Sequence, residues 1–399
     1  MKKLSKDVYI CAAKRTPIGS FGKSLSSFSA PKLCSSLVKP VLEQGFSNFE
    51  SGKNAVNELI IGCVLQAGVG QAPARQVLVY SGLPLSVQAM TVNKVCSSGL
   101  AAVMLGALKI EGKDAEIILA GGMESMSNAP YILHRHRFGA QLGHDSVEDC
   151  IITDGLWDIY GDKHMGQCAE LCAREYNFSR EEQDEFAVLS YTRALKAARE
   201  GWFKNEIVPL TVVEKKKEVT VSEDEEPKRF NQEKIPVLKP AFEKEGTVTA
   251  ANASSINDGA ALLLLAGEEG CKRYNLKPLA RIVGYSWFGQ EPEWFTTAPV
   301  GATKKLLEKV GKSIDEVDLF EVNEAFAVVA LAYIKELNLS REKVNISGGA
   351  VALGHPIGAS GARILITLLN NLKRTGGRVG LAAICNGGGE ATAMMVEML

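Results

Sequence analysis

Short apolar runs alternate with helical patterns in the first third of the chain. The runs Asn57–Leu65 and Ala115–Ser125 predict buried strands, and we expect the second to run into a turn at Gly121 and Gly122. Between them, the stretch that starts at Cys96 is apolar nearly all round, which predicts a buried helix. This alternation favours an α/β fold with a largely parallel sheet and helices on its faces.

The last third of the chain repeats this plan. Val317–Phe326 predicts a strand that ends in polar groups, Gly354–Arg374 a glycine-rich turn and a helix, and Arg378–Glu390 a strand that runs into glycines. These segments match those of the first third in order and spacing, which indicates an internal duplication. The duplication would place Cys96 and His355 at equivalent helix starts, near a pseudo-twofold axis.

The middle of the chain follows another pattern. Ser179–Gly201 begins with a capping box, Ser179 with Glu182, and predicts a helix. Glu214–Arg229 carries charges of both signs and predicts a solvated hairpin or loop. We interpret the middle as an insertion in the first half that covers the functional edge of the sheet.

Composition and charge exclude several classes of protein. The chain has 399 residues and a formal net charge of −1, which argues against nucleic acid or an anionic membrane as the main partner. No apolar run has the length of a membrane span, and the start lacks the apolar core of a signal peptide, although removal of an organelle leader would leave a similar start. The nine cysteines are scattered without disulfide or zinc spacing, which favours a reducing compartment.

Cys96 is a candidate nucleophile. A thiol at a helix N-terminus meets the positive end of the helix dipole, which should lower its pKa. Its small neighbours Ser97, Ser98 and Gly99 would let a substrate approach. The alternative is a cysteine that only fills the core.

A thiol nucleophile needs a base, and the chain has five histidines. His134, His136 and His144 lie in a basic, loop-like stretch that predicts exposure; a His-x-His metal site there would need a third ligand. His355 stands among glycines beside Pro356, where the backbone can approach a ligand closely. A turn histidine that bonds only to backbone is the alternative.

Two further segments carry candidate chemistry. Cys385 precedes three consecutive glycines at a strand end, where backbone N–H groups could hold an oxyanion. Asn323 follows another strand, although a lone Asn is more often a cap. Both lie at element ends where ligands bind in open α/β sheets.

At these residues the chain resembles the thiolase family over essentially its whole length. The matching stretches, in the family's order, are "NKVCSSG", "GGMESMS", "KHMG", "TVTAANAS", "NEAF", "GHPIGASGAR" and "CNGGG". The resemblance implies duplicated βαβαβαββ halves in a five-layered αβαβα arrangement with an inserted α/β loop domain. The expected domains are residues 1–121 with 254–276, the insertion 122–253, and the second half 277–399.

The resemblance also implies catalytic roles. Cys96 would carry the acyl group and His355 would take its proton. Cys385 would move the α-proton of a second acetyl-CoA, and the enolate oxygen would be held by His355 and by a water fixed by Asn323. Backbone N–H groups of Cys96 and Gly387 would form the other oxyanion hole. Thioester exchange and carbon-acid deprotonation are two separate reactions. Two cysteines that face one histidine would provide the groups for both.

The stretch "KHMG" resembles the short-chain acetoacetyl-CoA thiolases, which implies acetyl-CoA, acetoacetyl-CoA and CoA as partners and no covalently bound cofactor. The implied CoA and acyl-group contacts are Leu156, His164, Met165, Tyr191, Arg229, Lys234, Ser254, Ala325 and Phe326. The implied potassium ligands match the positions Tyr191, Ala250, Ala251, Ala253 and Val351. The family resemblance further implies a homotetramer, a dimer of dimers, in the mitochondrial matrix or the cytoplasm. Glu390 and Ala391 follow the last triple glycine, where many family members have a glycine in one of these two positions; this departure puts the shape of that loop in question.

Three alternatives remain at the level of the sequence. A β-ketoacyl synthase would use a second His or an Asn with His in place of a catalytic second cysteine. A non-catalytic CoA- or lipid-binding relative would be expected to lose Cys96, His355 or Cys385, and all three are present. A papain-like protease would show an aromatic-rich motif that is absent here. Condensation and thiolysis share one transition state, so metabolite levels set the direction.

Overall fold

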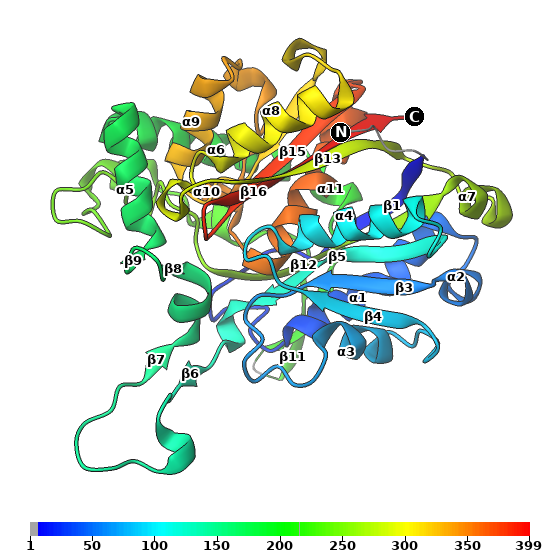
Figure 1. The fold of residues 1–399 in the computed structure, drawn as a ribbon, viewed down its shortest axis with the longest axis horizontal. Coiled ribbons are helices and arrows are strands. Elements are labelled where there is room, and N and C mark those ends of the chain that lie inside the picture. The colour runs from blue at the N-terminus through cyan, green and yellow to red at the C-terminus, as the bar shows by residue number, and fades with distance from the viewer. Residues whose placement is uncertain (1–6, 215) are drawn as a thin grey trace.

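The fold is built on one mixed sheet assembled from two similar halves (Figure 1), seen in a computed structural model that describes residues 7–214 and 216–399. A short strand, β2 (Gly19–Ser20), pairs with β12 beside the main path. The two halves join where β1 pairs antiparallel with β13 through Tyr9 and Ile10. The main strands follow the spatial order β4 (Gln88–Val92), β3 (Glu58–Gly62), β5 (Ile117–Ser125), β12 (Asn257–Gly267), β1 (Val8–Arg15), β13 (Ala280–Gly289), β16 (Glu390–Met398), β15 (Val379–Asn386) and β14 (Leu319–Val322). The expectation of a largely parallel sheet is wrong: among the described strands of this sheet, β3 pairs in parallel with β4 and β5, and β14 with β15, whereas the other pairs are antiparallel.

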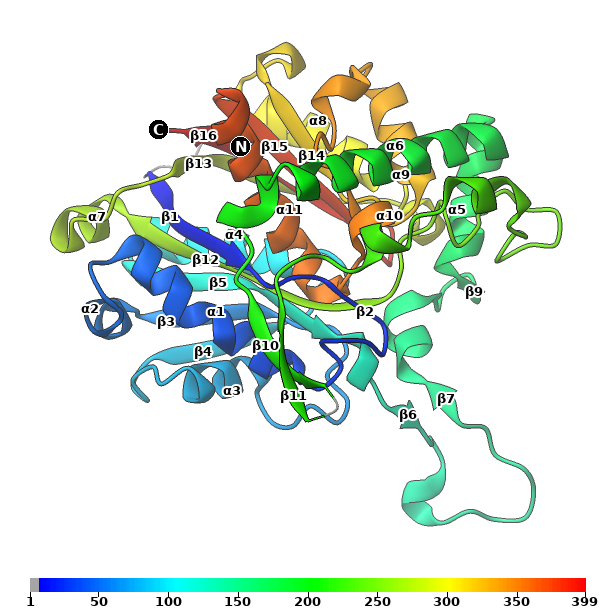
Figure 2. The same ribbon diagram turned by 180° about the vertical axis from the view of Figure 1, so that it is seen from behind.

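Helices form three layers: one lies between the two halves of the sheet, and one covers the outer side of each half. The buried helices α4 (Ser98–Glu111) and α11 (Ile357–Thr375) pack together between the halves (Figures 1 and 2). The outer layers are α1 (Ala30–Gly45), α2 (Phe49–Ala55) and α3 (Pro73–Tyr80) on one side, and α8 (Ala298–Val310) and α9 (Ala327–Glu336) on the other. Each layer has its own apolar cluster, so the predicted αβαβα arrangement is confirmed.

The element order confirms the predicted duplication. The first half reads β1, α1, β3, α3, β4, α4, β5 and, after the insertion, β12 and α7 (Glu268–Tyr274). The second half repeats this order from β13 to β16 with two differences. Its third strand is reduced to an isolated bridge between Phe320 and Val344, and the described residues form no helix equivalent to α7 after β16. The chain turns away there because Asn345 and Gly348 have φ values of 48° and 79°, which end an extended strand.

The glycine pair Gly121 and Gly122 differs from its prediction. Both residues lie inside β5, paired with β12, and not in a turn. A Cβ on Gly122 would lie 2.0 Å from the carbonyl oxygen of Gly358 in α11. The glycine is therefore needed for the close approach of α11 to the sheet.

The insertion between β5 and β12 supplies a cap over one end of the sheet. Helix α6 carries the predicted capping box of Ser179 and Glu182. The predicted charged hairpin forms as β10 and β11, although Lys215 lies outside the described residues, as do residues 1–6 of the expected first domain. The main elements of the insertion are β6 (Tyr131–Ile132), β7 (Glu148–Asp149), β8 (Trp157–Asp158), β9 (Lys163–His164), α5 (Met165–Tyr176), α6 (Arg180–Arg199), β10 (Leu210–Glu214) and β11 (Lys217–Val221).

The segment after this hairpin is less solvated than predicted. Asp224 is buried and pairs with the Arg15 guanidinium at 2.7 Å, while Glu206 pairs with the same guanidinium at 2.6 Å. Two carboxylates neutralise one buried cation, which fixes the insertion to the end of β1.

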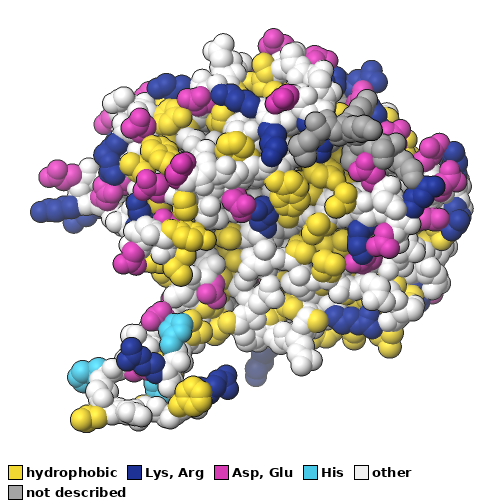
Figure 3. Space-filling model, in the orientation of Figure 1, with side chains coloured by type: hydrophobic (Ala, Val, Ile, Leu, Met, Phe, Trp, Pro, Cys, Tyr) yellow, Lys and Arg dark blue, Asp and Glu magenta, His cyan; other side chains and the backbone are white. Residues whose placement is uncertain are grey.

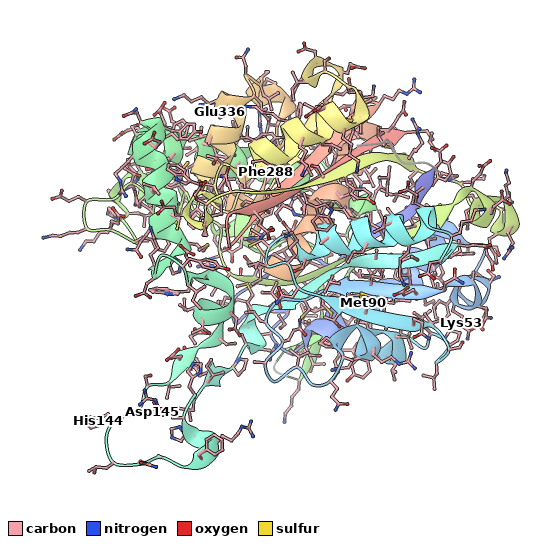
Figure 4. All side chains as sticks on the ribbon, viewed as in Figure 1. Lys53, Met90, His144, Asp145, Phe288 and Glu336 are labelled. Carbon is pink, nitrogen blue, oxygen red and sulfur yellow. The ribbon has the colours of Figure 1, made fainter. Side chains whose placement is uncertain are left out.

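The loop between β6 and β7 projects from the body (Figure 3), and Figure 4 places His144 and Asp145 on it. His134 and His136 face Glu148 and Asp145 at 3.2 and 3.1 Å, and the three histidines are exposed as predicted. Within the described residues, no cluster of His, Cys, Asp and Glu is arranged to hold a metal ion. The helices in the described part of the chain are all too short or too polar to cross a membrane.

Candidate active site

Cys96 lies in a tight turn at the start of α4. Val95, directly before it, has a φ of 48°, which is strained for a β-branched residue. Side chains hold the turn: Asn93 Oδ1 accepts from the Val95 N–H at 2.9 Å, and Ser98 Oγ accepts from the Lys94 N–H at 2.8 Å. The strained turn presents Cys96 to a cavity that its side chain helps to line.

The pKa of Cys96 is raised, and not lowered as the sequence predicts. The N–H groups of Cys96 and Gly387 lower its pKa, as a helix start should, but burial acts more strongly and raises the pKa to about 12. The resting group is therefore a neutral thiol, so a nucleophilic role for Cys96 would require a base that removes its proton.

His355 stands just before α11, the helix equivalent to α4. Its backbone N–H donates to Asn257 Oδ1 at 2.9 Å, and its Nδ1 lies 2.6 Å from Ser360 Oγ. Because the Ser360 hydroxyl donates to the Pro356 carbonyl at 3.0 Å, this network assigns the ring proton to Nδ1 and leaves Nε2 as an acceptor. Burial, with Arg363 nearby, lowers the pKa of His355 to about 3, so the ring is neutral.

Asn323 and Cys385 lie directly behind the cavity wall. Asn323 Nδ2 is 3.4 Å from His355 Nε2, and within the described residues its buried Oδ1 has no hydrogen-bond partner. Cys385 is buried near the end of β15, and burial together with the neighbouring Cys96 raises its pKa well above the usual value. The structure thus brings all four candidate side chains to one place.

The glycine loop after Cys385 faces the Cys96 turn. Gly388 and Gly389 have φ values of 89° and 79°, which an L-residue would adopt only with strain. Glu390, the departure from the family pattern, forms an ion pair with Lys94 next to Cys96. The pair links the two loops whose N–H groups, at Cys96 and Gly387, converge on the sulfur of Cys96.

The cavity has a volume of about 650 Å³ and walls from both halves and the insertion. Val351 lies outside its wall, in α10 (Ala350–Leu353), and donates its N–H to Glu324. The other predicted contacts line it: Leu156, His164, Met165, Tyr191, Arg229, Lys234, Ala250, Ala251, Ala253, Ser254, Ala325, Phe326 and Gly387, with Cys96 and His355.

Several aromatic and apolar lining residues were missed by sequence reasoning. Phe242 stacks on His164 with ring centroids 4.7 Å apart, and Phe230 stacks on Tyr191 at 4.8 Å. Phe21, Met126, Phe295 and Ile357 also line the cavity. Met126 and Ile357 lie within the matching stretches "GGMESMS" and "GHPIGASGAR", which could have marked them. The four phenylalanines lie in separate segments without a motif, so no local signal in one sequence marks them.

Two family models cover almost the whole chain. The thiolase N-terminal domain matches residues 8–269, and the thiolase C-terminal domain matches residues 276–398. The chain belongs to the thiolase family. The resemblance found in its motifs is therefore confirmed.

Relatives of this thiolase carry acetyltransferase names. The mitochondrial acetyl-CoA acetyltransferase of Bos taurus is 49% identical over 395 residues, 98% of this chain and 92% of the relative. Acetyl-CoA acetyltransferase IA of Candida tropicalis is 48% identical over 395 residues, 98% of this chain and 97% of the relative.

Solved thiolase structures match the fold closely. A thiolase from Ascaris suum in complex with coenzyme A is 46% identical with a TM-score of 0.92, covering 99% of this chain and 100% of that one. The human mitochondrial 3-ketoacyl-CoA thiolase has a TM-score of 0.95 at 39% identity, covering 99% of this chain and 100% of that one. The fold is thus shared by thiolases with different names, and substrate choice must come from the cavity walls.

Proposed function

We propose that this thiolase is an acetyl-CoA C-acetyltransferase. It catalyses the reversible Claisen condensation of two acetyl-CoA molecules to acetoacetyl-CoA and CoA, by a ping-pong mechanism through acetyl-Cys96. The observation that carries the proposal is the convergence of Cys96, His355, Asn323 and Cys385 at one cavity. The acetyltransferase relatives, at 48–49% identity over nearly the full chain, support acetyl-CoA as the substrate.

In the first half-reaction, His355 Nε2 takes the thiol proton of Cys96 while the sulfur attacks the thioester carbonyl of acetyl-CoA. The developing oxyanion accepts hydrogen bonds from the N–H groups of Cys96 and Gly387; their place beside the Cys96 sulfur supports this role. The C–S bond to CoA then breaks, and the Cys385 thiol gives its proton to the leaving CoA thiolate. The products are acetyl-Cys96, protonated His355, the Cys385 thiolate and free CoA.

In the second half-reaction, the Cys385 thiolate takes an α-proton from a new acetyl-CoA. The enolate oxygen accepts a hydrogen bond from protonated His355 Nε2 and from a water held by Asn323, whose side chain lies beside that nitrogen. The enolate carbon attacks acetyl-Cys96, the Cys96–acyl bond breaks, and Cys96 regains its proton from His355. Acetoacetyl-CoA leaves and every group returns to its resting state.

The insertion is proposed to bind the rest of CoA. The wall from Leu156 and Met165 to Phe326 is apolar and suits pantetheine and a short acyl group, whereas Arg229 and Lys234 suit the phosphorylated nucleotide end. Ser254 donates its hydroxyl to the Ala325 carbonyl at 2.9 Å, which joins the first half, directly after the insertion, to the second half at the acyl pocket. The division into residues 1–121 with 254–276, 122–253, and 277–399 follows from these roles.

The test of the function is direct. Incubation with acetyl-CoA alone should yield acetoacetyl-CoA and CoA, and mass spectrometry after quenching should find one acetyl group on the Cys96 peptide. A β-ketoacyl synthase would give no condensation from acetyl-CoA alone, and a CoA-binding relative would give neither product. Absence of both products with correctly folded protein would reject the proposal.

His355→Asn should slow both half-reactions. The variant removes the base at Cys96 and the donor to the enolate oxygen, so kcat should fall by at least about 10²-fold. Acetylation of Cys96 and condensation are measured separately, by quenched-flow mass spectrometry and by acetoacetyl-CoA formation. Near-normal rates of either step would exclude His355 from that step.

Potassium activation is a further proposal about this site. Among the described residues, the carbonyls of Ala250, Ala251 and Ala253 accept no backbone hydrogen bond, and they share the cavity with Tyr191. Carbonyl oxygens and a phenol are hard donors that suit an alkali cation, and Val351 would complete the set from α10. Turnover should therefore be higher in potassium chloride than in sodium chloride at equal ionic strength; equal rates would exclude the site.

We also propose a homotetramer, a dimer of dimers. The projecting loop between β6 and β7 exposes Phe138 and Leu142 almost completely, as a contact with other subunits would require. Light scattering of the intact chain and of a Phe138→Asp, Leu142→Asp variant tests this. The nine cysteines are all free thiols, which suits the mitochondrial matrix or the cytoplasm as the working compartment.

A further inference from the structure

Glu124 is a buried carboxylate that the proposed reaction does not use. It lies near the end of β5, is 0% exposed, and accepts three backbone N–H groups. The donors are Val64 at 3.0 Å, Leu65 at 3.2 Å and Gly358 at 3.0 Å. The first two follow β3 in the first half, and Gly358 lies in the first turn of α11 in the second half. One side chain therefore joins the two halves at the level of the active site.

On the side of the second half, Glu124 faces the N-terminus of α11. The N–H groups there have no partner within the helix, and the positive end of its dipole favours a carboxylate. The carboxylate and the first turn of α11 are in close contact. There is no room for a side chain between them, because a Cβ on Gly358 would lie 2.7 Å from Glu124 Oε2. Gly358 is three residues after His355, so the carboxylate restrains the turn that carries the base.

On the side of the first half, hydrogen bonds continue from Glu124 to Cys96. The Val64 N–H donates to Glu124, and the Val64 carbonyl accepts from Asn93 Nδ2 at 3.4 Å. Asn93 Oδ1 in turn accepts from the N–H of the strained Val95, directly before Cys96. The carboxylate is thus linked to both reacting residues, through a few bonds on each side.

We propose that Glu124 is a positioning residue that holds the His355 turn of α11 in register with the Cys96 turn of the opposite half. The inference rests on the proposed function, because it assumes that Cys96 and His355 react with one another. Glu124 does not line the cavity, so its loss should change the chemical steps more than the binding of acetyl-CoA.

The charge of Glu124 affects the pKa of Cys96, and this pKa is a second, independent measurement of the role of Glu124. Its negative charge raises the pKa of Cys96, whereas burial raises the pKa of Glu124 itself to about 7, against the opposing effect of its N–H donors. The other titratable groups that interact with it are Cys63, whose Sγ lies 3.7 Å from Oε1, and Cys150. In alkaline buffer Glu124 is ionised, so removing its charge should ease ionisation of Cys96.

The experiment compares Glu124→Gln and Glu124→Asp with the wild-type chain. Glutamine keeps the shape but places an NH₂ group against an N–H donor, and aspartate keeps the charge but is too short to reach all three donors. Both should lower kcat by about 10- to 100-fold with KM for acetyl-CoA nearly unchanged, because a small misplacement of reacting groups is costly. The pH profile of Cys96 alkylation by iodoacetamide should move to lower pH in the glutamine variant and stay in place in the aspartate variant.

Glu170→Gln is the matched control for the alkylation profile. Glu170 is also buried and accepts the N–H groups of Thr247 and Val248, but it is not among the charges that act on Cys96. Its alkylation profile should match wild type. The proposal is overturned if folded Glu124 variants turn over within two-fold of wild type, or if their KM rises as much as kcat falls. A wild-type chain that forms no acetoacetyl-CoA would reject the proposed function instead, and the alkylation profiles would still report on Glu124.

Discussion

Cys96→Ser should abolish acetyl transfer, with kcat reduced by at least about 10³-fold. The substitution keeps the size of the side chain and the strained turn at Val95, but a hydroxyl is a far weaker nucleophile than a thiol whose proton passes to His355. The neutral imidazole, with a pKa lowered to about 3, cannot activate a hydroxyl well. Mass spectrometry after acetyl-CoA should find no acetyl group on the variant's peptide that carries position 96, and no acetoacetyl-CoA should form.

Cys271→Ser is the matched control for this experiment. Cys271 is a partly exposed free thiol like Cys96, but it lies in α7, outside the cavity wall. The control should keep both the acetylated Cys96 peptide and the turnover. Labelling of Cys385 in place of Cys96 in the wild-type chain would contradict the assignment of the nucleophile.

Cys385→Ser should separate the two chemical tasks. The variant keeps Cys96, His355 and the N–H groups of the oxyanion hole, and a CoA thiolate can leave without a proton from Cys385, so Cys96 should still be acetylated, although more slowly. Exchange of the α-protons of acetyl-CoA with deuterium should fall by at least about 10²-fold, because serine is a far poorer acid and base than cysteine. Steady-state condensation should fall with it, since no enolate forms.

Two assays on this one variant decide the role of Cys385. Burst acetylation is followed by quenched-flow mass spectrometry, and deuterium uptake into the acetyl methyl group by mass or NMR. Loss of acetylation would show that CoA cannot leave without the proton from Cys385, or that Cys385 shapes the first site. Retained deuterium uptake would assign the α-proton to another residue, with His355 the nearest base.

Local sequence patterns predicted most of the helices and strands of this fold. The strands β3, β14 and β15 and the helices α4, α6 and α11 lie where hydrophobic periodicity and caps predict them. Two of the wrong expectations, at the glycine pair and at Asp224, have tertiary causes. Gly121 and Gly122 stay extended because β12 pairs with them and α11 needs the space, and Asp224 is buried because Arg15, 209 residues away, pairs with it.

In the candidate site, too, some features follow from local sequence and others only from tertiary packing. Motif residues identified the chemistry, and the duplication predicted that Cys96 and His355 lie at equivalent helix starts. The sequence argument for a lowered pKa of Cys96 had the correct sign for the helix start, but burial outweighs it. Burial is set by residues from many segments, and no single stretch of sequence carries it.

By itself, the sequence determined the α/β class, the duplication, the insertion and the candidate groups for the chemistry, because periodicity, capping and short motifs act over a few neighbouring residues. Only the tertiary structure decided which aromatic side chains line the cavity, which tautomer of His355 the Ser360 hydroxyl selects, and that Glu124 joins the two halves. Each of these depends on contacts between residues far apart in the chain, whose distances follow from the packing of the two halves against each other.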